Sequence, residues 1–218
     1  MITIDIDGPS AVGKTTLIRS LNEKLPDSAP VSELLSQKPN PYIRWTTPEE
    51  FLKKQLWFFE HTVQRYLLPA SPDQKIRIND IGITDVIIHT FIYPAANNLP
   101  WDVFTDFQQA VIHNYPDLAL ANHIFYLHAS AGTIAERRKG DTQRIRNAFE
   151  SNMKLYPYQK EFYFRLMERF PGQVRCMDGE KSTYALTAEI IQELDKRKNS
   201  PSIRLYDLLS TADFLKRH

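Results

Sequence analysis

Short apolar runs alternate with longer amphipathic runs along this chain. The short runs, which are typical of buried strands, cover residues 2–6, 29–35, 75–80, 123–128 and 173–178. Apolar positions at helical spacing predict helices over about 14–25, 48–68, 82–93, 101–113, 148–169 and 183–197. Strands that alternate with helices in this way predict a parallel sheet flanked by helices. The pattern therefore favours the α/β class, with five parallel strands.

The loop after the first strand matches the pattern G-x-x-x-x-G-K-[ST], with Gly8, Gly13, Lys14 and Thr15 at the defining positions. Glycines let the backbone fold tightly, so that its N–H groups and the following helix N-terminus surround phosphate oxygens. A chance match in a glycine-containing turn is the alternative, but the strand before and the helix after argue against it. The residues expected to bind ATP are Gly8, Ser10, Ala11, Val12, Gly13, Lys14, Thr15 and Thr16.

Acidic residues stand at the ends of two other predicted strands. Glu33 lies near the end of the second strand, and Asp80 ends the third, followed by Asp85, which we expect to bind the acceptor. Open α/β sheets bind ligands at the carboxyl ends of their strands. A carboxylate beside a phosphate-binding loop commonly holds Mg²⁺ or orients the attacking group. We therefore expect Thr15 and Asp80 to bind Mg²⁺, and Asp80 to take part in catalysis.

The predicted helix over 48–68 is rich in aromatic residues and has few polar ones, among them Gln55. One interpretation is a helix that packs in the core. The other is that part of its aromatic face, including Phe59, lines a pocket for a flat acceptor molecule, because ring systems stack well on aromatic side chains. The sequence leaves both open.

A basic run follows the fourth predicted strand. Its members are Arg137, Arg138, Lys139, Arg144 and Arg146. Such a run is often only a solvated basic face. After a strand of a phosphate-binding protein, it also suits a lid over about 132–147 that closes on the transferring phosphoryl group. We expect Arg137 and Arg144 to neutralise negative charge on the phosphates when this lid closes.

Composition and length limit the possible domain organisation and the possible binding partners. The 218 residues predict one domain over 1–199, followed by a tail helix over 200–218 that packs on it or binds a partner. The 27 basic and 26 acidic residues give no reason to expect nucleic-acid binding through overall charge. No apolar run reaches the ~18 residues of a membrane span, so no membrane partner is expected. The single cysteine, Cys176, fits a reduced, cytoplasmic setting.

These motifs together resemble the P-loop nucleoside and nucleotide kinase superfamily, and thymidylate and deoxynucleoside kinases in particular. The resemblance rests on residues 8–16, Asp80 with Asp85, the basic segment, and residues 174–179. It implies a three-layer P-loop kinase fold with an arginine-rich lid. It also implies that Glu33 accepts a proton from the acceptor hydroxyl and that Gln55 contacts a base edge.

One departure concerns position 81. Both kinase families have an arginine after the acid that ends the third strand, whereas this chain has Ile81. In thymidylate kinases that arginine helps to hold the phosphate of the acceptor. The departure lowers the case for a phosphate acceptor, unless Arg44 or Arg65 takes its place.

The sequence thus predicts an ATP- and Mg²⁺-dependent kinase that acts on a hydroxyl group of a nucleoside or nucleoside-like small molecule. Three alternatives remain: a nucleoside monophosphate kinase, a kinase for a specialised metabolite, and a non-kinase NTPase or nucleotide-gated interaction protein. The aromatic helices over 48–68 and 148–169 leave a homodimer open as well.

Overall fold

The computed structural model describes residues 1–31, 45–69, 72–140 and 149–217. Its centre is a five-stranded sheet in the order β2-β3-β1-β4-β5, in which every neighbouring pair is parallel. The strands are β1 (Ile2–Asp7), β2 (Ser28–Val31), β3 (Ile76–Asp80), β4 (His123–His128) and β5 (Val174–Asp178). The sequence prediction of a five-stranded parallel sheet is confirmed.

Strand β1 occupies the middle of the sheet because nearly all of it can be buried. Ile4 and Ile6 are fully buried on one face, and Asp5 and Asp7 are fully buried on the other. The register pairs Ile6 with Asp80 of β3. The ends of β1 and β3 therefore lie next to each other, and the loop that follows β1 begins beside Asp80.

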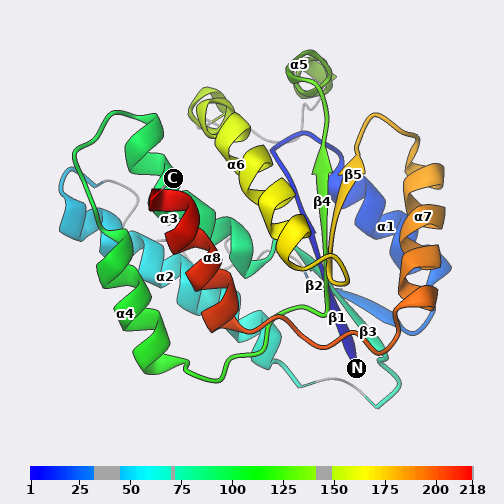
Figure 1. The fold of residues 1–218 in the computed structure, drawn as a ribbon. Helices are drawn as coiled ribbons and strands as arrows, with labels where there is room; N and C mark the ends of the chain where they lie inside the picture. The colour runs from blue at the N-terminus through cyan, green and yellow to red at the C-terminus, as the bar shows by residue number, and fades with distance from the viewer. Residues whose placement is uncertain (32–44, 70–71, 141–148, 218) are drawn as a thin grey trace.

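Helices cover both faces of this sheet (Figure 1). One layer contains α1 (Lys14–Lys24) and α7 (Thr183–Lys196), which pack against each other over Ile4 and Ile6. The elements of the other layer are α2 (Pro48–Leu67), α3 (Ile83–Ala96), α4 (Phe104–Asn114), α6 (Phe149–Arg169) and α8 (Leu205–Arg217). The short helix α5 (Ala131–Gly140) follows β4 at the carboxyl edge of the sheet (Figure 1). None of the helices within the described residues combines the length and apolar character that crossing a bilayer requires.

Local sequence explains most helix ends. Helix α2 begins with a capping box. The side chain of Thr47 accepts from the backbone N–H of Glu50, and the side chain of Glu50 accepts from the backbone N–H of Thr47. The helix predicted over about 82–93 extends further than expected, because α3 continues to Ala96 with Pro94 inside it and is capped by Asn97. Pro94 lacks the N–H that would donate to the residue four positions earlier, but the N–H of Asn97 still donates to the backbone oxygen of Tyr93 at 3.2 Å and closes the last turn.

The C-terminal segment is part of the same core. Ile203 exchanges backbone hydrogen bonds with Leu120 and Ala121, at 2.8 and 3.0 Å. Helix α8 then packs on α3, α4 and α6, with Leu208 and Leu209 buried. The apolar positions of this segment whose side chains are described, from Ile203 to Ala212, are therefore buried within the chain.

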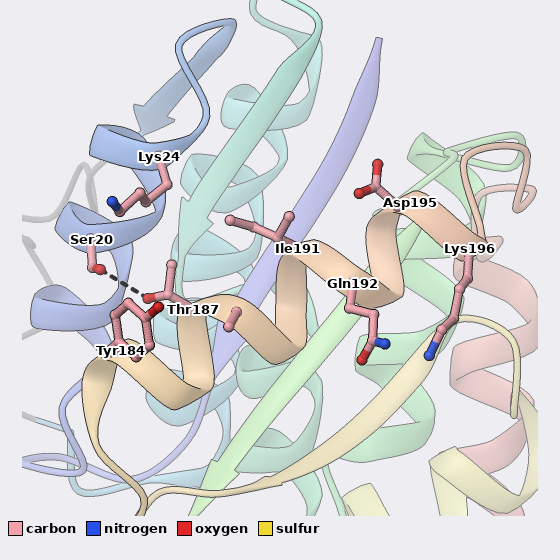
Figure 2. Close-up of a pocket in the computed structure, with 9 residues that line it drawn as sticks. Ser20, Lys24, Tyr184, Thr187, Ile191, Gln192, Asp195 and Lys196 are labelled. Atoms are coloured by element: carbon pink, nitrogen blue, oxygen red, sulfur yellow. Dashed lines mark hydrogen bonds between the residues drawn. The ribbon is translucent and has the colours of Figure 1, made fainter.

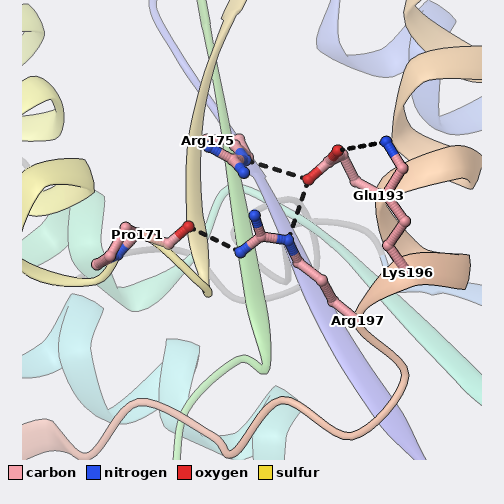
Figure 3. Close-up of polar contacts among 5 residues, drawn as sticks. All are labelled: Pro171, Arg175, Glu193, Lys196 and Arg197. Carbon is pink, nitrogen blue, oxygen red and sulfur yellow. Dashed lines mark hydrogen bonds and ion pairs between the residues drawn. The ribbon is translucent and has the colours of Figure 1, made fainter.

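An ion network holds α7 to the edge of the sheet opposite the loop after β1 (Figure 3). The carboxylate of Glu193 contacts Arg175 of β5 at 3.2 Å, Arg197 at 3.1 Å and Lys196 at 3.4 Å. Arg197 also donates to the backbone oxygen of Pro171 at 2.8 Å, in the turn before β5. This network therefore connects the amino end of β5 and the turn before it to the C-terminal end of α7.

A surface groove of about 610 Å³ runs between α1 and α7 (Figure 2). The hydroxyl of Thr187 donates to Ser20 across it at 2.9 Å, and Tyr184 stands at its rim with 78% of its surface exposed. Its lining residues come from α1 and α7 and include none from the loop after β1. The groove is therefore separate from the site described next.

Candidate active site

The loop between β1 and α1 has the backbone of a phosphate cradle. Gly8, Ala11 and Gly13 have positive φ values of 141°, 67° and 110°, a region that glycine enters at little cost. A Cβ at Gly8 would lie 2.5 Å from the backbone oxygen of Leu127, so no larger residue fits there. Helix α1 starts at Lys14 without a side-chain cap, which leaves its first N–H groups directed at the loop.

Two side chains of this loop are placed for phosphate and metal chemistry. Lys14 is buried, and its Nζ donates to the backbone oxygens of Gly8 and Pro9 at 2.8 and 3.0 Å. The hydroxyl of Thr15 lies 3.3 Å from Asp80 Oδ2. The structure therefore brings together the two residues expected to hold Mg²⁺. A hydroxyl and a carboxylate suit this ion, which usually takes few protein ligands and completes its shell with phosphates and water.

Two buried carboxylates lie directly beneath the loop. Asp5 accepts from Tyr66 at 2.5 Å and from Asn79 at 2.8 Å. Asp7 accepts from the backbone N–H of Gly82 at 2.6 Å and from the hydroxyl of Tyr163 at 2.6 Å. Burial, together with the charge of Asp7, raises the pKa of Asp5 to about 7. Burial likewise raises the pKa of Asp7.

These carboxylates constrain the turn between β3 and α3. A Cβ at Gly82 would lie 2.2 Å from Asp5 Oδ2, so only glycine fits at that position. The preceding residue, Ile81, has φ of 65°, a value that β-branched residues rarely adopt. The turn beside Asp80 is therefore strained and held by the buried acids, as is common near functional sites.

Arg65 of α2 reaches the same centre. It is 2% exposed, and its Nη1 donates to the backbone oxygen of Asp80 at 2.7 Å. Its positive charge faces Asp5 and Asp7. The chain thus lacks an arginine at position 81 but places a guanidinium from another helix next to Asp80.

The loop opens into a cleft of about 1340 Å³. Its other walls come from α2, α3, α5, α6 and the turn after β5, represented by Phe58, His89, Arg137, Met153 and Gly179 respectively. Typical small-molecule pockets measure ~300–1,000 Å³. The cleft is therefore larger than one such ligand needs.

One face of α2 lines this cleft and the opposite face joins the core. The lining residues are Lys54, Gln55, Phe58, Thr62 and Arg65, a spacing that follows the helix period. The expectation that Phe59 binds the acceptor is wrong. It is fully buried in the core, where its ring lies 5.5 Å from that of Phe107. One residue turns the helix by about 100°, so Phe58 faces the cleft and Phe59 does not.

Two other expected acceptor residues line the cleft. Gln55 is 2% exposed, and its Oε1 lies 3.5 Å from the hydroxyl of Thr90. Its Nε2 is buried and has no hydrogen-bond partner among the described residues. Asp85 of α3 accepts from Gln159 of α6 at 2.5 Å, which joins opposite walls. An unpaired buried amide is costly, so Gln55 is suited to bind a ligand.

Phe58 and His89 line the end of the cleft away from the loop. Outside the lining, the imidazole of His89 stacks on Tyr93 with their centroids 4.9 Å apart, and the buried Phe51 lies 5.5 Å from Tyr93. Burial and the charge of Lys54 lower the pKa of His89 to about 3, so this imidazole is neutral near pH 7. Such a wall suits a flat ring.

The basic segment that was expected to form a lid begins as α5. Arg137 lines the cleft and donates to the backbone oxygen of Val12 at 2.7 Å, so it touches the phosphate-binding loop. Glu180, in the turn after β5, accepts from the N–H of Ser130 at 2.8 Å and from Thr133 at 3.0 Å. These bonds anchor the first turn of α5.

Three expected site residues, Glu33, Arg44 and Arg144, lie outside the described residues. Sequence reasoning missed several others that the structure places in or beneath the cleft: Asp5, Asp7, Lys54, Phe58, His89, Gln159 and Tyr163. Only the first two left a signal, since acids at alternate positions of a buried strand share one face.

Comparison with solved structures supports the same architecture. Deoxyadenosine kinase from M. mycoides with bound dCTP superposes with a TM-score of 0.68 at 19% identity, covering 89% of this chain and 100% of that one. Its complex with dATP gives 0.68 at 18% identity, over the same shares of the two chains. Thymidylate kinase from Candida albicans gives 0.65 at 17% identity, over 93% of this chain and 95% of that one. This chain has the P-loop kinase fold.

Comparison of the sequence with known families and proteins gives no match. No family model matches it, and no curated protein is similar enough to match. At these identities the structural likeness establishes the fold and leaves the activity to be argued from the site.

Proposed function

We propose that this protein is an ATP- and Mg²⁺-dependent kinase that transfers the γ-phosphate to a hydroxyl group of a nucleoside or nucleoside-like small molecule. The observation that carries the proposal is the continuity of the cleft. The cleft has a volume of about 1340 Å³. It begins at the phosphate-binding loop and continues to a region lined by Gln55, Phe58 and His89. A protein that only binds or hydrolyses a nucleotide needs no second compartment of this kind.

The loop residues have the roles that phosphate binding requires. Backbone N–H groups at the start of α1 and the ammonium of Lys14 bind and orient the phosphates. Thr15 and Asp80 would hold Mg²⁺, which neutralises phosphate charge when bound. Arg137, at the edge of the loop, adds a positive charge where negative charge builds up during transfer.

The acceptor proton has two candidate bases. Glu33 is the residue that the kinase resemblance implies, and Asp80 is the carboxylate nearest the loop hydroxyl of Thr15. Because Asp80 is also assigned to Mg²⁺, we assign the proton to Glu33. Phosphoryl transfer depends mostly on positioning and charge compensation, so the base contributes less than the cations do.

A second candidate function is a nucleoside monophosphate kinase. The observation in its favour is Arg65, a buried guanidinium that lines the cleft next to Asp80. A phosphate on the acceptor would find a cation there. The guanidinium already balances Asp5 and Asp7, however, so the hydroxyl acceptor remains our first choice.

The test is ADP formation with three sets of acceptors: nucleosides, nucleoside monophosphates and hydroxylated metabolites. The wild type is compared with Glu33→Gln and with the exposed control Glu23→Gln. Turnover of a nucleoside that Glu33→Gln abolishes and Glu23→Gln preserves supports the proposal. Turnover of a monophosphate that survives Glu33→Gln transfers the assignment to the second candidate. ATP binding without turnover of any acceptor favours the nucleotide-gated interaction protein.

Placement in the cytoplasm and assembly as a homodimer remain predictions. The first rests on the single Cys176, and the second on the aromatic helices α2 and α6. Size-exclusion chromatography with light scattering tests the second.

A further inference from the structure

The far end of the cleft contains a cation that has no anionic partner in the part of the chain that the structure describes. Lys54 lines the cleft from α2, and its Nζ lies 5.2 Å from the ring centroid of Trp45 and 5.8 Å from that of Phe58. Within the described residues it forms no ion pair. The ammonium group is partly shielded from water, and this burial lowers its pKa. Contacts with the ring faces of Trp45 and Phe58 offset only part of the hydration energy that the ammonium loses.

The acidic residue one turn before Lys54 is already engaged. Glu50 lies at i−4, but its carboxylate accepts from Thr46 at 2.7 Å and from Thr47 at 3.4 Å as part of the capping box. On the facing helix α3, His89 is neutral near pH 7 because burial and the charge of Lys54 lower its pKa. Among the described residues, the ammonium therefore faces aromatic rings and a neutral imidazole, and the Glu50 carboxylate is hydrogen-bonded in the capping box.

The position of Lys54 on α2 sets its distance from the chemistry. It stands 11 residues before Arg65, the residue that contacts Asp80, and a helix rises ~1.5 Å per residue. The backbone positions of the two residues are thus about 16 Å apart along α2. A ligand in contact with Lys54 while it receives a phosphoryl group near Asp80 must be elongated, with its distal end against the aromatic wall.

We propose that the acceptor of this kinase carries a carboxylate at the end remote from the transferred phosphoryl group, and that Lys54 binds it. The inference rests on the proposed function for the identity of the ligand as an acceptor. A single ammonium beside a neutral imidazole matches one negative charge. A phosphate dianion would call for several donors, which the described part of this wall does not offer. The flat aromatic surroundings place the carboxylate on a ring.

The test compares probes that differ only in charge. Calorimetry measures the dissociation constants of N6-(4-carboxybenzyl)-2′-deoxyadenosine and its 4-carboxamide, and of benzoate and benzamide. The small pair is included because its binding does not depend on recognition of a sugar. A charged hydrogen bond contributes about 1.5–3 kcal/mol, which corresponds to a roughly tenfold to hundredfold preference. We expect the carboxylate of at least one pair to bind more tightly than its amide by that factor.

Variants assign the preference to Lys54. Lys54→Met keeps the apolar stem and should remove the preference, and Lys54→Arg should retain most of it. The control is Lys53→Met, at the exposed neighbouring position, which should leave the preference intact. ATP affinity, measured in the same way, should be equal in all four proteins because the phosphate-binding loop lies at the other end of the cleft.

Several outcomes overturn the inference: equal binding of carboxylate and amide in both pairs, no binding of either carboxylate, or a preference that survives Lys54→Met. If neutral nucleosides are phosphorylated while the preference is absent, the proposed kinase function stands and this inference fails. If the preference follows Lys54 but no acceptor is ever phosphorylated, the anion site stands and the kinase proposal fails.

Discussion

The buried carboxylate of Asp5 gives a prediction that runs against the usual effect of core substitutions. Asp5→Asn should stabilise the protein at pH 8. Asp5 is fully buried beside Asp7, and burial together with the charge of Asp7 raises its pKa to about 7. At pH 8 the folded protein therefore carries a buried negative charge on Asp5, next to the second buried carboxyl group of Asp7. Replacing the Asp5 carboxylate by an amide of the same shape removes the cost of burying that charge.

The magnitude follows from the pKa shift. Raising the pKa from 3.8 to about 7 corresponds to roughly 4 kcal/mol at ~1.36 kcal/mol per unit. This is an upper value, because the shift belongs to the coupled pair and Asp7 remains. The hydrogen bonds can be kept, since Asn79 Oδ1 is buried without a partner among the described residues and a flipped amide could accept from the new side chain. We expect a net gain of about 2 kcal/mol.

The sign of the pH dependence is fixed by the same shift. Between pH 4 and 7 the folded state of the wild type binds more protons at Asp5 than the unfolded state does. Its free energy of unfolding therefore falls as pH rises through this window. Asp5→Asn removes this group, so its stability should change less over the same range. Near pH 4, where Asp5 is protonated, the two proteins should be similarly stable.

Urea unfolding and calorimetry at pH 4.5, 6 and 8 check this prediction. For a protein of this size, about 2 kcal/mol corresponds to a Tm increase of roughly 4–8 °C at pH 8. The matched control is Asp73→Asn, which makes the same chemical change at an exposed residue and should be neutral. The reasoning is refuted if Asp5→Asn destabilises the protein equally at pH 4.5 and pH 8. That result would mean that Arg65 and the hydrogen bonds from Tyr66 and Asn79 fully compensate the buried charge.

Three further predictions follow from single contacts. Arg137→Ala should slow phosphoryl transfer by ~10³-fold or more while the dissociation constant for ATP changes far less, and equal losses in both would contradict its role in the lid. Tyr163→Phe removes the hydroxyl that donates to Asp7 and should cost about 1.5–3 kcal/mol in urea unfolding, whereas Tyr158→Phe, on the exposed side of the same helix, should have no effect. Glu193→Gln should lower the free energy of unfolding by about 1–2 kcal/mol at low salt through loss of the network in Figure 3, and a loss that is unchanged at 1 M salt would argue against an electrostatic cause.

Most of the fold could be predicted because its signals are local. The period of apolar positions distinguished strands from helices, and the order of elements implied a parallel sheet. The observed helix α2 starts at the predicted residue because Thr47 and Glu50 form a capping box within four residues of each other. The end of α3 was predicted less well, since Pro94 is tolerated in a last turn that packing holds in place.

Some residues of the candidate site could likewise be named from the sequence, and others depend on tertiary packing. The phosphate-binding loop is one contiguous motif, so its residues could be named from sequence, and Asp80 was placed beside it by the rule that parallel strands end at one edge. Which face of α2 meets the cleft was a different matter. Phe58 and Phe59 are equivalent in type and adjacent in sequence, and only the packing of α2 against α3 and α4 decides that the second is core.

The sequence by itself therefore determined the elements, their order and the loop, because each depends on residues close together in the chain. Tertiary structure alone decided that Tyr66 and Tyr163 meet the acids of β1, and that Lys54 faces an aromatic wall. These contacts join residues up to 156 positions apart. Their formation depends on how whole helices rotate and pack on the sheet, and no local pattern of side chains encodes that rotation.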